Sequence, residues 1–143
     1  MTMFRNILAA VDLGDQETST KVIDGALEVF SNGDTLHVIT VVPDYGLSIV
    51  GTFFPKGHES ELIEHAQTEL HAFTAKTVPE GTPLQHVIAH GSIYEEIIRA
   101  ANKLKVDLIV MGSHRPALED YLLGPNAARV MRHADQSVLV VRN

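Results

Sequence analysis

The sequence alternates between short apolar runs and longer segments with helical periodicity, and this alternation constrains the fold more than any other feature. Apolar runs rich in β-branched residues occupy residues 4–12, 34–42, 85–91, 106–112 and 137–143. Several of them are continuous, which is typical of strands that are buried on both faces. The runs therefore predict a parallel sheet of five strands that is covered by helices.

The segments between these runs carry apolar residues at three- and four-residue steps, the spacing of an amphipathic helix. Ser92 and Glu95 have the spacing of a capping box at the start of the third such helix. Strict alternation of strand and helix favours an α/β fold with right-handed crossovers. We expect the strand order 3-2-1-4-5, with helices on both faces. The expected stripes are Val22, Ile23, Ala26, Leu27 and Phe30; Leu62, Ile63, Ala66, Leu70 and Phe73; Ile93, Ile97, Ile98 and Ala101; and Ala127, Val130, Met131 and Ala134.

Length and charge narrow the class of protein. The 143 residues suit a single domain spanning 1–143, and no apolar run is long enough for a membrane span. The first residues lack a signal-peptide pattern, and the chain has no cysteine. The formal net charge of −7 argues against a nucleic acid as the main partner. We expect a cytoplasmic protein without membrane insertion.

Two strand ends are expected to face one crevice. In an open parallel sheet, ligands bind beyond the carboxyl ends of the strands, at the point where the strand order reverses. With the expected order this point lies between the first and fourth strands, which end at Asp12 and Gly112. Gly112 would let a ligand lie against the strand end, and Asp12 would accept hydrogen bonds from a ribose hydroxyl.

The segment after Gly124 adds a potential anion site to this crevice. Gly124 suits an N-cap, and Pro125 suits the first helical position, where a missing N–H costs little. The N–H groups of Asn126 and Ala127 would then be free for an anion, with the helix dipole behind them. From the residues alone, both a phosphate site and a purely structural turn remain open.

Taken together, several stretches resemble the universal stress protein family over essentially the whole chain. They are "NILAAVD", "LHVITVVP", "AHGSIYEEI", "DLIVMGSH" and "YLLGPNAARVMRHADQSVLVV". The resemblance implies a Rossmann-like sandwich of the adenine nucleotide alpha hydrolase type. It also implies a homodimer joined through residues 137–143. The apolar connection 43–57 adds a tetramer as a further assembly. In one large subgroup the resemblance implies an ATP site, with or without Mg²⁺.

That subgroup carries a G-x-x-G-x9-G-[ST] pattern, which this chain matches in part. Gly112 and Gly124 correspond to the first and last glycines. Arg115 replaces the middle glycine, the spacer "PALEDYLL" is one residue shorter, and Pro125 stands where Ser or Thr is usual. Arg115 either clamps phosphates through its guanidinium group or fills the space that a glycine would leave open.

The resemblance also implies a role for each matching position. Asp12 would hold the ribose or adenine side, and Val38 would meet adenine through its backbone. Met111 and Gly112 would line the base and ribose. The residues implied around the phosphates are Ala10, His114, Arg115, Gly124, Asn126 and Ala127, with Pro125 in the Ser/Thr position.

Other polar groups suggest no separate chemistry. The eight histidines form no H-E-x-x-H motif, so we expect no metal site. The pairs Glu59/Glu61 and Glu95/Glu96 are expected on exposed helix faces as solvated charges. The apolar connection 43–57 either packs on its own sheet, closes over a ligand or forms an oligomer contact.

Three functions follow as hypotheses. The first is an ATP-binding regulatory module that is not an enzyme and that serves a stress response or a protein partner such as a transporter. The second is an interaction and dimerisation module whose nucleotide site has decayed through Arg115 and Pro125. The third is a slow ATPase or phosphatase.

Overall fold

The computed structural model describes residues 4–30, 34–43, 58–113 and 125–142. Strands and helices alternate along the chain as the sequence predicts. The strands are β1 (Ile7–Ala10), β2 (Leu36–Pro43), β3 (Leu84–Gly91), β4 (Leu108–Gly112) and β5 (Ser137–Val141). The helices are α1 (Gln16–Val29), α3 (His58–Thr77), α4 (Ile93–Leu104) and α5 (Pro125–His133).

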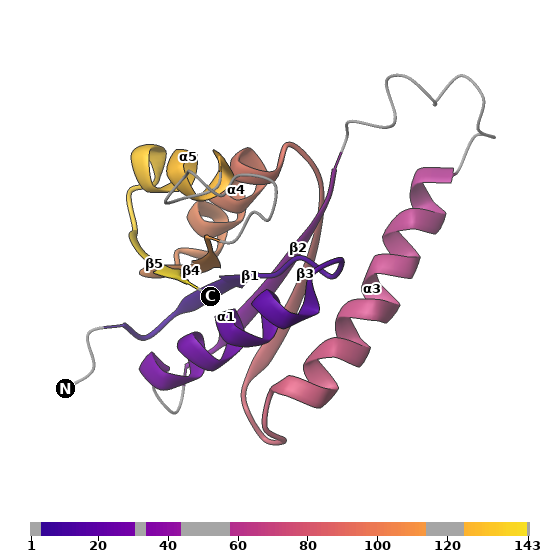
Figure 1. The fold of residues 1–143 in the computed structure, drawn as a ribbon, viewed down its shortest axis with the longest axis horizontal. Coiled ribbons are helices and arrows are strands. Elements are labelled where there is room, and N and C mark those ends of the chain that lie inside the picture. Colours follow the sequence, from indigo (N-terminus) through magenta and orange to yellow (C-terminus); the bar gives the residue numbers. More distant parts are fainter. Residues whose placement is uncertain (1–3, 31–33, 44–57, 114–124, 143) are drawn as a thin grey trace.

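All five strands join one parallel sheet in the order β3-β2-β1-β4-β5, which confirms the predicted order (Figure 1). Ile7 pairs with Leu36 on one side and with Leu108 on the other. The strand order therefore reverses between β1 and β4, and the carboxyl ends of these two strands lie next to each other. This is where a ligand crevice is expected in such a sheet.

Two helical layers cover the sheet, with α1 and α3 on one face and α4 and α5 on the other (Figure 1). Phe73 and Leu70 of α3 are buried in the first layer, and Ile97 and Val130 are buried in the second. Each such side chain contributes about 1.5–3 kcal/mol when it leaves water. Most of the predicted apolar stripes thus pack in the two core layers. Met131, which is 50% exposed, does not, and Leu62, Ile63 and Ala66 at the start of α3 are only half-buried and lie outside both layers.

The expected polar details of α4 are partly wrong. Ser92 is the N-cap but makes no side-chain capping bond, so the capping box does not form. Glu95 is exposed as expected, and its Oε1 accepts a hydrogen bond from Tyr94 Oη at 3.2 Å. The Glu96 side chain is only 12% exposed and lies 2.7 Å from Arg99 Nη1, so it is a paired charge rather than a solvated one.

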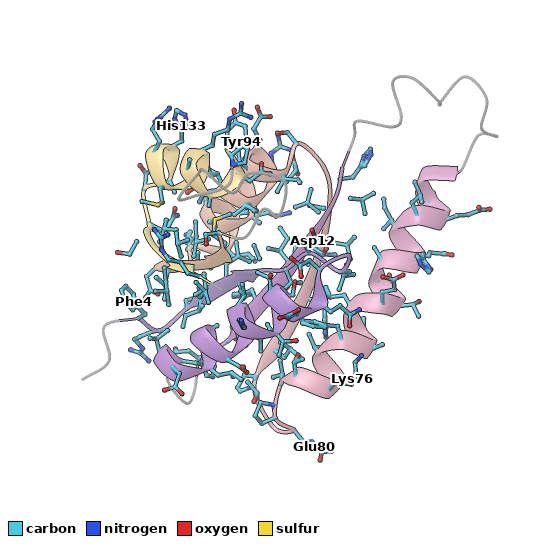
Figure 2. All side chains as sticks on the ribbon, in the orientation of Figure 1. Phe4, Asp12, Lys76, Glu80, Tyr94 and His133 are labelled. Atoms are coloured by element: carbon cyan, nitrogen blue, oxygen red, sulfur yellow. The ribbon has the colours of Figure 1, made fainter. Side chains whose placement is uncertain are left out.

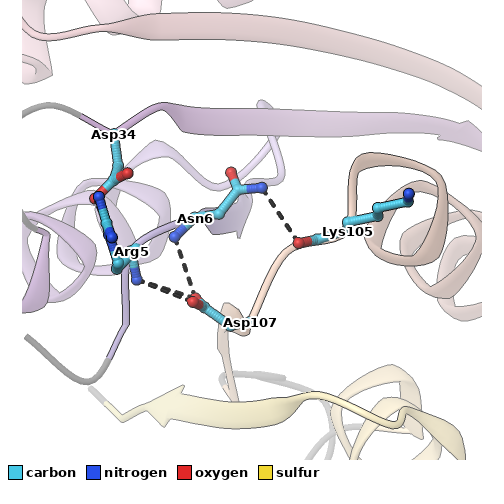
Figure 3. A network of polar contacts seen from close by, with 5 residues as sticks. All are labelled: Arg5, Asn6, Asp34, Lys105 and Asp107. Carbon is cyan, nitrogen blue, oxygen red and sulfur yellow. Dashed lines mark hydrogen bonds and ion pairs between the residues drawn. The ribbon is translucent and has the colours of Figure 1, made fainter.

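The amino-terminal edge of the sheet is held by a polar network (Figure 3). The backbone N–H groups of Arg5 and Asn6 donate to the Asp107 carboxylate at 3.0–3.2 Å. Arg5 Nε lies 3.2 Å from Asp34 Oδ2 and so reaches toward β2. The backbone N–H groups of Arg5 and Asn6 are thus bonded to a side chain and not to a neighbouring strand. For this reason β1 begins at Ile7 and not at residue 4 as expected.

The Asn6 side chain connects three segments at this edge. Its Nδ2 donates to the carbonyls of Leu104 and Lys105 at 3.0 and 3.3 Å, and its Oδ1 lies 2.8 Å from His37 Nε2. His37 is only 6% exposed, and burial lowers its pKa below the ordinary histidine value, with a smaller opposing effect from Gln85. His37 therefore favours the neutral form in the folded protein.

Several expectations concern residues outside the described ranges. These are residues 44–57 of the 43–57 connection, His114, Arg115 and Gly124. Within the described ranges, no helix is long and apolar enough to cross a membrane.

Candidate functional site

A cavity of about 500 Å³ opens at the carboxyl ends of β1, β2 and β4, where the strand order reverses. Its walls come from the start of α1 on one side and from α4 and α5 on the other. This volume is in the range of pockets that hold small ligands. The described lining residues are Ala10, Val11, Asp12, Asp15, Thr18, Ser19, Val22, Ile39, Val41, Ile93, Ile97, Met111, Gly112, Ser113, Asn126 and Ala127.

The turn between β1 and α1 holds Asp12 in a fixed position at this cavity (Figure 2). Ser19 Oγ donates to the Asp12 carbonyl at 2.8 Å and accepts the Asp12 N–H at 2.9 Å. Asp12 Oδ1 accepts the Gly14 N–H at 2.9 Å. The Asp15 side chain caps α1 by accepting the Thr18 N–H at 3.2 Å. Asp12 is therefore exposed at the cavity but restrained by backbone bonds on both sides.

Gly112 permits a close approach between β4 and α1. A methyl group at Gly112 would lie 2.7 Å from Thr18 Cγ2 and 3.4 Å from Val22 Cγ2. The first distance is too short for any real carbon contact, so a glycine is needed for packing alone. The sequence suggested that Gly112 makes room for a ligand. In the structure, the space that its missing side chain leaves is taken by α1.

The first turn of α5 faces the cavity from the opposite side. The helix begins at Pro125, as predicted, and Asn126 and Ala127 line the cavity. The first N–H groups of a helix have no partner within the helix, and the positive end of its dipole lies there. Arg132 and His133 stand in the last turn, where positive charge suits the other end of the dipole.

The cavity divides into an apolar part and a polar part. Ile39, Val41, Ile93, Ile97 and Met111 pack with the core beneath α4 and α5 and form the apolar part. The carboxylates of Asp12 and Asp15 and the hydroxyls of Thr18 and Ser19 belong to the α1 side. Among the described lining residues there is no Lys or Arg. An anion at this site would therefore lie toward α5 and away from the two carboxylates.

Most of the site residues that the sequence predicts and that lie within the described ranges come together at the cavity. Ala10, Asp12, Met111, Gly112, Asn126 and Ala127 all line the cavity. Val38 does not, because its side chain is fully buried in the core beneath α1 and α3. Pro125 begins α5 but is not part of the lining.

Sequence reasoning missed several lining residues, of which Asp15, Thr18 and Ser19 are the most polar. The stretch "TST" at 18–20 lies too far beyond Asp12 for a flavodoxin-type phosphate loop, so the sequence predicts only that it caps or decorates the first helix. However, α1 begins at Gln16, so Thr18 and Ser19 belong to the start of the helix and lie beside the end of β1. The signal was available, since Asp15 precedes a helical period and is a favourable N-cap residue.

The part of the chain that the structure describes contains no group of three or more His, Asp or Glu side chains that could hold a metal ion. The cavity thus offers Asp12 and Asp15 as its described carboxylates, each of which already accepts a backbone N–H. This arrangement suits recognition of hydroxyl groups more than the tight binding of a bare cation.

Comparison with known proteins gives a consistent result. The model of the universal stress protein family matches residues 3–142. Universal stress protein A homolog 1 of Coxiella burnetii is 36% identical over 146 residues, covering 96% of this chain and 96% of that protein. Universal stress protein G of Escherichia coli O157:H7 is 28% identical over 142 residues, covering 98% of this chain and all of that protein.

Solved structures show the same fold. Universal stress protein UspA from Lactobacillus plantarum superimposes with a TM-score of 0.70 at 22% identity, covering 99% of this chain and 100% of that one. A universal stress protein from Archaeoglobus fulgidus in complex with dAMP gives 0.63 at 18% identity, covering 98% and 99%. A universal stress protein in complex with cAMP gives 0.58 at 21% identity, covering 96% of each chain.

Proposed function

The chain belongs to the universal stress protein family, and we propose that it is an adenine nucleotide-binding regulatory module whose ligand is ATP. The observation that carries the proposal is the cavity of about 500 Å³ at the reversal of strand order, which has an apolar part and a helix amino terminus. Relatives of the same fold have been solved with cAMP and with dAMP. The same cavity is where such a ligand would bind in this chain.

The chemistry of the lining suggests how ATP would be oriented. The apolar part between Ile39 and Met111 suits a purine ring, because it would remove apolar surface from water. Asp12 would accept a ribose hydroxyl through its carboxylate. The phosphates would extend toward α5, where the N–H groups of Asn126 and Ala127 and the helix dipole favour negative charge. Mg²⁺, where present, would be bound by the phosphates of the nucleotide.

The residues carried over from the family complete the proposed site. His114, Arg115 and Gly124 would surround the phosphates from the segment that precedes α5. Val38 would contribute through its backbone, since its side chain faces the core. Pro125 supplies no N–H, so the proposed phosphate contacts of α5 begin at Asn126.

We propose a regulatory role rather than rapid turnover. The two described carboxylates at the cavity are held by backbone N–H groups and also help to build the turn and the helix cap. Phosphoryl transfer to water needs a positioned group that orients or activates the water. A single cytoplasmic domain that forms homodimers through β5 and signals its nucleotide state to a protein partner fits this role.

A charge substitution at α5 tests the proposal. Asn126→Asp places a carboxylate beside the proposed phosphates but keeps the side-chain shape, and an acidic residue in the first turn suits the helix dipole. We expect calorimetry with Mg·ATP to show an affinity roughly ten- to a hundredfold weaker than that of the wild type.

The matched control is Asn102→Asp on α4. Asn102 is exposed, and its Oδ1 accepts a hydrogen bond from Gln136 Nε2 at 2.9 Å, which an aspartate retains. This variant should bind ATP as the wild type does. Equal affinities in all three proteins would contradict the placement of the phosphates. No binding by the folded wild type would favour the interaction module with a decayed site.

A further inference from the structure

Two histidine rings are stacked between α3 and the edge strand β3, far from the nucleotide cavity. The ring centroids of His71 and His86 are 3.8 Å apart, with an angle of 27° between the planes. His71 belongs to α3 and His86 to β3, so the stack joins the helix directly to the strand. Stacked rings attract each other when they are neutral, but two imidazolium rings at this distance would repel strongly.

A buried hydroxyl fixes one ring of the stack. Thr74 Oγ1 lies 2.7 Å from His86 Nε2 and 3.2 Å from the His71 carbonyl, to which it donates. Thr74 is only 3% exposed, whereas the His71 side chain is exposed. The Thr74 hydroxyl donates to His86 Nε2 or accepts its N–H according to the tautomer of the ring, and in either case it holds the His86 ring against α3.

The surroundings of His86 favour its neutral form. Burial lowers the pKa of His86, and the neighbouring His71 lowers it further. On the same sheet face, β2 presents Leu36, Val38 and Thr40 and β3 presents Leu84 and Ile88, none of which titrates. The described titratable groups beside this contact include His71, His90 on the same face of β3, and Glu80, which lines the adjoining groove with His71 and Thr74. No carboxylate is paired with His86 among the residues that the structure describes.

We propose that the His71–His86 stack is a proton-sensitive contact that loosens the docking of α3 on β3 when the surroundings acidify. The docked state holds His86 neutral, whereas an undocked α3 leaves its ring in water, free to take up a proton. As the pH falls below about 6.5, the undocked state binds more protons and gains population. Acidification therefore opens the α3 side of the sheet first, while α4 and α5 stay docked on the other face.

Hydrogen exchange measured by mass spectrometry tests this proposal on the intact chain. Protection factors, corrected for the intrinsic pH dependence of exchange, are compared at pH 7.5 and 5.5. For the wild type we expect protection in α3 to fall roughly three- to tenfold, while protection in α5 changes little. In His86→Gln the difference between α3 and α5 should disappear, and in His71→Gln, which leaves His86 buried, it should become smaller.

His65→Gln is the matched control, since His65 is an exposed histidine of the same helix that pairs with Glu69. This variant should keep the full response. An α3 response that is absent in the wild type, persists in both stack variants or is lost in His65→Gln would overturn the proposal. If His86→Gln does not fold, titration of the histidine rings by NMR decides. The His86 ring should titrate below 6.5 and move upward in His71→Gln, and an unchanged midpoint would refute the coupling.

Discussion

At the scale of single residues, the cavity depends on close contacts that two small side chains allow. Gly112 lets α1 approach β4, and Ser19 uses one hydroxyl to hold both the N–H and the carbonyl of Asp12. Neither residue contributes a charge. Gly112 sets how closely α1 packs on β4, and Ser19 holds the Asp12 backbone, so substitutions at these positions should change stability and nucleotide affinity together.

Gly112→Ala should destabilise the protein because its new methyl group would meet Thr18 Cγ2 at 2.7 Å. We expect a loss of about 1–3 kcal/mol in the free energy of unfolding, measured by urea denaturation. Thr18→Ser removes the methyl group that causes the clash and keeps the hydroxyl. The double variant should therefore recover part of the loss, and strict additivity of the two changes would show that the clash is not the cause.

Ser19→Ala should also lower stability, since Ser19 is 2% exposed and both of its hydrogen bonds go to the Asp12 backbone. The expected loss is about 1–3 kcal/mol. Thr20→Ala is the comparison, because the Thr20 hydroxyl only donates to the Gln16 carbonyl on the helix surface. Similar losses in the two variants would contradict a special role for Ser19.

The sequence indicated some of these residues and missed others for physical reasons. Asp12 and Gly112 were identifiable because strand ends and the reversal of strand order can be inferred from hydrophobic patterns. The packing role of Gly112 was not predicted because the path of α1 over β4 depends on tertiary packing. Thr18 and Ser19 were missed because their contribution depends on where α1 begins.

At the scale of elements, the carboxyl end of the sheet forms the proposed binding site, and the amino end contributes to stability. The carboxyl ends of β1, β2 and β4 form the cavity, whereas their amino ends are held by Asn6 and Asp107. Strand positions and order followed from the sequence because each strand is a short apolar run and the helices between the strands carry apolar stripes with a helical period. The exact start of β1 did not, because the Asp107 side chain replaces a neighbouring strand as the acceptor for two backbone N–H groups.

Asn6→Ala should lower stability without changing nucleotide binding. The change removes the bonds to the Leu104 and Lys105 carbonyls and the contact with His37, leaving a buried ring without this partner. We expect a loss of about 1–3 kcal/mol in urea denaturation and an unchanged affinity for ATP in calorimetry. A change in affinity comparable to that of Asn126→Asp would show that the two ends of the sheet are coupled.

At the scale of the whole molecule, two histidines make stability depend on pH. The pKa values of His37 and His86 are both lowered, chiefly by burial. The unfolded chain therefore binds more protons than the folded one once the pH falls below about 6.5, and stability decreases from there through the folded pKa values. Urea denaturation at pH 7.5, 6.5 and 5.5 should show a continuous loss.

Replacing both histidines provides the test of that assignment. A protein that carries His37→Asn and His86→Gln should lose less stability between pH 7.5 and 5.5 than the wild type does. His133→Gln, at an exposed position on α5, should leave the dependence unchanged. An identical slope in the double variant and the wild type would assign the acid sensitivity to other groups.

The central claim is that adenine nucleotide binds where the strand order reverses, and a titration of the ¹⁵N-labelled protein with Mg·ATP tests it most directly. Backbone amide NMR signals would be followed to saturation. We expect the largest shifts at Asp12, Gly112, Asn126 and Ala127, with little change at Asn6 and Asp107 on the opposite edge of the sheet. Saturable shifts centred elsewhere, or none at millimolar ATP, would contradict the claim.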